Sequence, residues 1–417
     1  MLNHSVNSPS PRRWLNPLLL ALVLIGLNMR PLLTSIGPLL PTLRQATGLS
    51  FGGAALLTTL PVLMMGLMAL AGGAINRLFS ERSAVALSLL AIGLGALWRE
   101  LAPGSVQLLM SAVLGGLGIG VIQAVMPGII KHHFLKSMAL VAGLWSAALM
   151  GGGGLGAAIT PWLMSAGHDW HSALAWWALP ALVALLAWWP VSRGLSRLGA
   201  AGEHRGSSLL RNRRAWLLGA YFGLINGGYT SLIAWLPPYY MQLGWQPQAS
   251  GSLLALMTFG QVMGALLLPA LARNHDRRPL LLLALMMQLI GFIGLIYLPQ
   301  TLPWLWVLLS GLGLGGAFPL CLVLALDHLH QPAAAGRLVA FMQGVGFLLA
   351  GVTPYLSGLL RDYSGGFELD WQIHALLVVV LIAITWRFHP HSYRRRSPNN
   401  ISVIAAPYSD VAFTSGR

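Results

Sequence analysis

The sequence predicts an all-α integral membrane protein with twelve transmembrane helices, arranged as two pseudo-symmetric six-helix bundles. Its residues are 56% hydrophobic and only 8% charged, with a mean hydropathy of +0.69, whereas a soluble globular protein contains roughly 25% charged residues. Apolar segments long enough to cross a bilayer recur along the whole chain. Basic residues gather at alternate ends of these segments, and several short motifs occur once in each half.

The apolar segments define the expected spans. The first fourteen residues are polar, and the segment behind them is longer than a signal-peptide core and lacks a small-residue cleavage site. We therefore interpret it as the first permanent span. The expected spans are residues 15–40, 51–75, 83–98, 106–130, 138–164, 172–190, 215–239, 249–272, 279–298, 303–326, 336–360 and 371–388.

The basic residues indicate the orientation of these spans. With a cytoplasmic N-terminus, all of the 25 Lys and Arg residues face the cytoplasm except Arg30, Arg44, Arg99 and Arg361. The last three fall in external loops, and the acidic residues divide evenly, as the positive-inside rule allows. The net charge of +15 is thus a topology signal and does not indicate a nucleic-acid partner. Both termini are expected in the cytoplasm.

Four regions follow from this pattern: an N-terminal bundle (1–190), a cytoplasmic linker (191–214), a C-terminal bundle (215–388) and a cytoplasmic tail (389–417). Short motifs recur in order across the linker, which indicates two copies of one six-helix unit in the same orientation. The pairs are Thr34, Ser35 and Pro41 with Thr230, Ser231 and Pro237; Arg77 and Arg82 with Arg273 and Arg278; Leu114 to Gly120 with Leu309 to Gly315; and Thr160 to Trp162 with Thr353 to Tyr355.

This architecture resembles the major facilitator superfamily over essentially residues 15–388. The loop between the second and third spans, Gly72 to Arg82, is similar to the signature G-x-x-x-D-R-x-G-R-R of the superfamily. Asn76 stands at the position of its aspartate and Phe79 at a glycine. The gating contacts that the signature implies are therefore weakened in this chain.

Four segments are similar to the cyanate and nitroimidazole transporter family within that superfamily, namely residues 26–35, 143–154, 223–229 and 341–346. The resemblance implies a transporter of the bacterial inner membrane, not an enzyme, that moves cyanate or a related small monovalent anion by alternating access. One alternative is an exporter of neutral or weakly charged heteroaromatic compounds such as nitroimidazoles. A second alternative is a membrane receptor without transport.

Arg30 is the first candidate site residue. Its neighbours from Leu18 to Leu40 carry no charge, and a guanidinium at that depth costs at least a few kcal/mol unless it faces protein or water. Five donors and a permanent charge suit a small anion. No acidic residue lies away from the loops to neutralise it, although carbonyls could satisfy a structural arginine. Pro31, which has no N–H, either breaks the helix here or only kinks it.

The other candidate residues would replace the hydration that the anion loses. Asn226 occupies the position of Arg30 in the second repeat, and Tyr229 shares its helical face. Gln123 and Gln343 are preferred to Gln261 because spans four and eleven line the cavity in the resembling superfamily, with interhelical hydrogen bonding as the alternative. The expected substrate-binding residues are Arg30, Asn226, Tyr229, Gln123, Gln343 and Trp145.

We expect neither a cofactor nor a metal. The single cysteine, Cys321, lies inside an apolar segment, and no Cys/His cluster has metal-ligand spacing. The glycine runs lie inside spans, where small residues allow close helix packing. His374 is either an interfacial residue or a titratable one. Without a carboxylate inside the membrane, passive facilitation and proton coupling both remain open.

Overall fold

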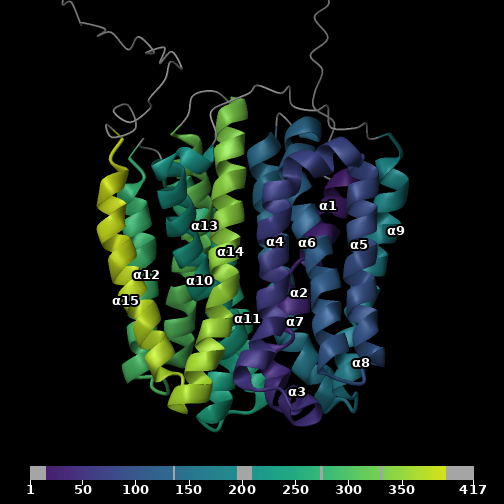
Figure 1. Ribbon diagram of the computed structural model, residues 1–417, viewed down its shortest axis with the longest axis vertical. Helices are drawn as coiled ribbons and strands as arrows, with labels where there is room; N and C mark the ends of the chain where they lie inside the picture. The colour runs from purple at the N-terminus through teal and green to yellow at the C-terminus, as the bar shows by residue number, and fades with distance from the viewer. Residues whose placement is uncertain (1–15, 135–136, 195–208, 273–275, 329–331, 391–417) are drawn as a thin grey trace, which may run out of the picture.

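The chain folds into two groups of helices that stand side by side, one ending at Val191 and the other beginning at Arg213 (Figure 1). The computed structural model describes residues 16–134, 137–194, 209–272, 276–328 and 332–390, and these contain helices and turns but no strands. In a bilayer, backbone polar groups must bond within the protein, and a helix achieves this within one segment. The helical fold thus follows from the apolar composition.

The first half contains six spans close to the expected positions. The first of them is not one continuous helix, because it comprises several short pieces. The elements are α1 (Pro17–Leu27), α2 (Pro31–Thr34), η2 (Gly37–Leu39), α3 (Leu40–Thr47), α4 (Phe51–Leu78), α5 (Glu81–Trp98), η3 (Arg99–Leu101), α6 (Ser105–His133), α7 (Met138–Ser165), α8 (Trp170–Ala175), α9 (Ala178–Val191) and η5 (Ser192–Gly194).

The second half repeats the arrangement with six long helices. Its elements are η6 (Leu209–Arg211), α10 (Arg213–Gln242), α11 (Pro247–Ala270), α12 (Arg278–Tyr297), α13 (Pro303–Leu326), α14 (Pro332–Ser364), α15 (Glu368–Thr385) and η7 (Trp386–Phe388). Residues 195–208 of the expected linker and 391–417 of the expected tail lie outside the described residues. The region boundaries around them therefore stay predictions.

Within the described chain, eleven spans are long and apolar enough to cross a membrane. The twelfth, α10, has 30 residues but carries several polar side chains in its middle. Those polar residues, Asn226, Tyr229, Thr230 and Ser231, are all buried. Polar groups within a span face the bundle interior or a cavity, so α10 is placed where a polar site can form.

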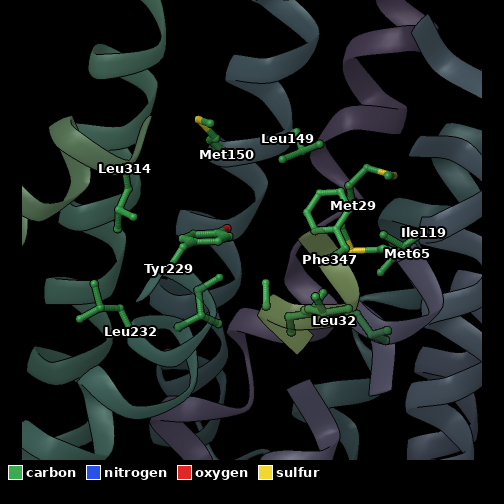
Figure 2. Packing of buried hydrophobic residues seen from close by; sticks show 14 of the residues in the cluster. Met29, Leu32, Met65, Ile119, Leu149, Met150, Tyr229, Leu232, Leu314 and Phe347 are labelled. Carbon is green, nitrogen blue, oxygen red and sulfur yellow. The ribbon is translucent and has the colours of Figure 1, made fainter. Parts of the chain in front are cut away.

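The two halves meet along paired helices. α4 packs along α14, and α7 packs along α11. Glycines permit the close approach, since a Cβ at Gly66 of α4 would lie 2.9 Å from the backbone of Gly344 in α14. Figure 2 shows the buried layer between the halves, with Met29 and Leu32 of the first span near Phe347 and with Tyr229 of α10 near Met150. The candidate site lies in this layer.

Candidate functional site

The first span is interrupted beside Arg30. α1 ends at Leu27, and α2 begins at Pro31, which has no N–H to donate to the carbonyl of Leu27. Arg30 is the N-cap residue of α2, and its carbonyl accepts hydrogen bonds from the N–H groups of Leu33 and Thr34 at 3.0 and 3.1 Å. Of the two interpretations of Pro31, the broken helix is the one that the structure shows.

Helix α7 presents glycines to this break. A Cβ at Gly153 would lie 3.3 Å from Cβ of Arg30, and one at Gly156 would lie 2.8 Å from Cα of Pro31. A Cβ at Gly152 would meet the carbonyl of Leu27. Only residues without side chains allow α7 to approach the irregular backbone this closely. Gly152, Gly153 and Gly156 of α7 therefore serve packing against the first span, and that packing fixes where Arg30 lies.

A cavity lies between the halves at this level. Its volume is about 40 Å³, counted as the space open to the centre of a water-sized sphere. One water requires at least about 10–15 Å³ on this measure, so the cavity has room for a solute of a few heavy atoms. The residues that line it are Arg30, Gln123, Trp145, Ser146, Leu149, Met150, Asn226, Tyr229, Gln261, Leu314 and Phe318.

Five of the six expected site residues therefore surround one cavity. They come from four elements: Arg30 from the break in the first span, Gln123 from α6, Trp145 from α7, and Asn226 and Tyr229 from α10. The geometry brings together residues from both halves, which is the arrangement that the repeat predicts.

Gln343 is the exception, because it lies on α14 outside the cavity lining, whereas Gln261 of α11 is part of it. Both are amides in apolar helices, and the sequence does not say which face of each helix turns inward. The expected preference for Gln343 over Gln261 relied on the resembling superfamily, in which spans four and eleven line the cavity. Leu314 and Phe318 line the same wall, and as apolar residues in apolar helices they gave no signal in the sequence.

Arg30 carries the one formal charge among the lining residues. Its side chain is buried, with 4% exposure, and none of the ion pairs found within the described residues includes it. The guanidinium carbon lies 5.3 Å from the centre of the Tyr229 ring, at cation–π distance. A ring face stabilises a cation without neutralising it. The cavity thus retains a net positive charge.

Four lining residues have a buried polar atom without a hydrogen-bond partner. They are donors in Arg30 (Nε) and Trp145 (Nε1) and side-chain amide oxygens in Gln123 and Gln261. Rotation of an amide by half a turn exchanges its oxygen and nitrogen, so either glutamine can offer a donor instead. Buried polar groups are normally paired, and the concentration of unpaired ones here indicates a place for a polar ligand.

The neighbouring asparagines have structural partners. Nδ2 of Asn28 donates to the carbonyls of Leu24 and Pro180 at 2.7 and 3.1 Å, so this residue ties the first span to α9. Nδ2 of Asn226 donates one of its two hydrogens to the carbonyl of Phe222 at 2.8 Å. The second N–H and the side-chain oxygen of Asn226 are not used by that bond.

Two charged or titratable residues outside the cavity are buried within the protein. Arg99, which we expected in an external loop, is fully buried at the end of α5 and contacts the first span. His374 is 4% exposed and lies 3.7 Å from the buried carboxylate of Asp370. Both residues stand near predicted span ends, where sequence alone does not separate a loop from a buried helix terminus.

A pair of six-helix bundles around a polar cavity, with irregular backbone beside it, is the architecture of a secondary transporter. The chain belongs to the Major Facilitator Superfamily, whose model matches residues 18–354. The predicted fold class is confirmed. So is the prediction of a multi-pass membrane transporter that is not an enzyme.

Known proteins resemble the chain over most of its length. It is 62% identical over 376 residues to the cyanate transport protein CynX of Escherichia coli (strain K12), covering 89% of this chain and 97% of that protein. It is 30% identical over 370 residues to the 2-nitroimidazole transporter of the same organism, covering 87% and 92%. The solved D-xylose-proton symporter has a TM-score of 0.74 at 16% identity, covering 90% and 98%, and supports the fold alone.

Proposed function

We propose that this protein carries cyanate, a small monovalent anion, across the bacterial inner membrane by alternating access of the cavity around Arg30. The observation that carries the proposal is a buried guanidinium without a carboxylate partner among the described residues, facing a cavity of about 40 Å³. The extended similarity to a cyanate transport protein supports this choice of anion.

The chemistry of the lining residues suits such an anion. Cyanate is linear, has three heavy atoms, and accepts hydrogen bonds at its oxygen and at its nitrogen. Arg30 and Trp145 offer unpaired donors, and Gln123 and Gln261 can present amide donors to the other end. One fixed cation balances one negative charge, whereas a divalent anion would leave a charge uncompensated in a low-dielectric site.

The two alternative functions are not favoured. A neutral heteroaromatic compound would leave the charge of Arg30 without a counter-charge in the cavity. A receptor without transport has no need of a polar cavity shared by two repeated bundles. In proteoliposomes, small anions should compete with cyanate, and neutral nitroaromatic compounds should not.

The decisive experiment is counterflow of labelled cyanate in proteoliposomes with Arg30→Gln. We expect loss of counterflow, because an amide cannot balance the charge of the anion. The matched control is Arg213→Gln, which removes an exposed cation at the start of α10, outside the cavity lining. Cyanate counterflow that persists in folded Arg30→Gln protein would contradict the proposal.

Energisation is part of the same proposal. The lining contains no carboxylate, which supports facilitated diffusion, while the buried Asp370 and His374 of α15 offer a place for a proton. Counterflow needs no driving ion, whereas accumulation requires one. Accumulation of cyanate that follows an imposed pH gradient would identify proton coupling, and equilibration without accumulation under the same gradient would identify facilitation.

We also propose that both termini face the cytoplasm, as the distribution of basic residues indicates. Two exposed residues at opposite ends of the bundles test this: Tyr363 (90% exposed) and Leu78 (73% exposed). Because Cys321 is buried, new cysteines can be introduced after Cys321→Ser. An impermeant maleimide should label Tyr363→Cys in intact cells and should not reach Leu78→Cys.

A further inference from the structure

Arg99 is a second buried cation in the first half, and nothing in the transport cycle proposed above uses it. Arg99 is fully buried and is the first residue of η3. No ion pair seen in the described parts of the chain includes it. A charged side chain is rare in a membrane span and normally marks a function.

The donors of Arg99 converge on the broken first span. Nη1 and Nη2 both donate to the carbonyl oxygen of Leu32 at 3.2 Å, and Nε donates to the hydroxyl of Ser111 on α6 at 3.3 Å. Leu32 is the second residue of α2, two positions beyond Arg30. Arg99 thus contacts a residue that is 67 positions away in the sequence and lies two positions from Arg30.

The carbonyl of Leu32 accepts these donors because the helix is irregular there. In a continuous α-helix it would bond the N–H of Ile36, but this N–H points to the carbonyl of Leu33 at 3.4 Å instead. An unpaired carbonyl in an apolar interior is costly. Two guanidinium donors that converge on this one oxygen satisfy it and hold its direction in a way that a single-point cation does not.

We propose that Arg99 is a positioning residue for the anion site: by fixing the carbonyl of Leu32, it holds α2 in the orientation that keeps Arg30 in the cavity. The inference rests on the proposed role of Arg30 as the anion-binding residue. Without Arg99, the carbonyl of Leu32 would gain by accepting the N–H of Ile36 as in a regular α-helix. This rearrangement of α2 would redirect Arg30, which is the N-cap residue of α2.

The test compares Arg99→Met, Arg99→Lys and Ser111→Ala for cyanate uptake, normalised to folded protein. Misplacement of a functional group by about 1 Å can lower the rate of a reaction on the order of a hundredfold. We therefore expect Arg99→Met to raise the KM for cyanate at least about tenfold, with a smaller change in maximal rate. Arg99→Lys, which keeps a donor for Leu32, should recover part of the affinity. Ser111→Ala leaves both bonds to Leu32 and should retain a KM near that of the unmodified protein.

A second readout does not depend on cyanate. Methylglyoxal modifies accessible arginines, and peptide mass spectrometry reports the extent at each site. We expect Arg99→Met to lower the modification of Arg30 and to leave that of Arg82 unchanged. This separates the inference from the proposed function, since Arg30 can be redirected whether or not cyanate is the substrate.

The inference is overturned if folded Arg99→Met protein keeps both the KM of the unmodified protein and its modification of Arg30. It is equally overturned if Ser111→Ala raises KM as much as Arg99→Met, because the contact with Leu32 would then be irrelevant. If Arg99→Met does not fold, Arg99→Lys decides by the same two measurements.

Discussion

The two buried arginines of the first half, Arg30 and Arg99, differ in the hydrogen-bond partners of their guanidinium groups. Nitrogens of Arg99 reach protein oxygens, whereas Nε of Arg30 has no partner. A buried donor without a partner costs about 1–3 kcal/mol, and more when the group is charged. A protein retains such a cost where a ligand removes it. At the scale of single residues, incomplete satisfaction therefore separates a binding arginine from a structural one.

The same criterion separates two glutamines. Gln261 lines the cavity with an unpaired side-chain oxygen, whereas Gln343 lies outside the lining. We expect Gln261→Leu to raise the KM for cyanate about twofold to tenfold, the equivalent of one hydrogen bond of about 0.5–1.5 kcal/mol. Gln343→Leu is the matched control and should leave KM unchanged. Uptake kinetics in proteoliposomes measure both, and equal effects of the two variants would argue against the cavity as the site.

The sequence identified the residues that contrast with their surroundings. Arg30 stands out as a charge in an apolar span, and Tyr229 and Asn226 follow from the repeat. The preference for Gln343 over Gln261 does not match the cavity lining, because which residue lines the cavity depends on the rotation of two helices about their axes. When a helix is apolar on every side, its hydropathy pattern does not indicate which face turns toward the cavity.

At the scale of elements, the positions of the spans were predictable, but the break in the first one was not. A proline in a membrane span breaks or kinks the helix according to what its neighbours supply. Here the neighbours are the glycines of α7 and the donors of Arg99, from distant parts of the sequence. The assignment of Arg99 to a loop hid the second of these partners.

The glycine face of α7 gives a prediction for this element. A Cβ at Gly152 would overlap the carbonyl of Leu27, whereas a Cβ at the adjacent Gly151 would meet nothing within 4 Å. We expect Gly152→Ala to abolish cyanate counterflow and to destabilise the protein by about 1–3 kcal/mol, as overpacking does.

Gly151→Ala is the matched control, because it makes the same chemical change one position away. It should transport normally and keep its melting temperature in detergent. Equal behaviour of the two alanine variants in counterflow and thermal unfolding would show that close packing against the break is not required.

At the scale of the whole molecule, a hydrogen-bonded contact joins the two halves where α4 begins and α14 ends. The carboxylate of Asp362 on α14 accepts hydrogen bonds from the N–H groups of Phe51 and Gly52 at 3.1 and 2.9 Å. These N–H groups begin α4, where a carboxylate also meets the positive end of the helix dipole. The Phe51 ring is flanked by the guanidiniums of Arg44 and Arg361.

Removal of this contact should favour separation of the halves at that end. Loss of a cap costs about 0.5–2 kcal/mol, which changes the ratio of two states by up to about thirtyfold. Spin labels at Gln45→Cys and Tyr363→Cys, after Cys321→Ser, would report this opening as a longer distance. We expect Asp362→Ala to increase the population with the longer distance.

Asp169→Ala is the matched control for Asp362→Ala. Asp169 also caps a helix, since its carboxylate accepts from the N–H of Ser172 at 2.9 Å, but both residues belong to the first half. Its loss should lower stability without changing the distance between the labels. If both variants lengthen that distance, general loosening of the fold explains the result and the contact between halves does not.

The end of the second half beyond α13 contains a histidine that must stay neutral. Nδ1–H of His328 donates to the carbonyl of Leu324 at 2.6 Å, and its Nε2 accepts from Nε of Arg214 at 3.1 Å. Burial, with the nearby Arg214 charge, lowers the pKa of His328 from 6.5 to about 4. Protonation of Nε2 would remove an acceptor and place two cations side by side.

Stability should therefore depend on pH in a defined window. Because the folded pKa of His328 lies below its unfolded value, the unfolded state binds the proton first, and stability is complete above pH 6.5 and declines as the pH falls toward about 4. His328→Gln cannot take up this proton, so its melting temperature should fall less between pH 7 and pH 4.5 than that of the unmodified protein. Parallel pH profiles for the two proteins would show that the acid sensitivity arises elsewhere, and the neutral bridge between α13 and α10 would then contribute little to the stability of the second half.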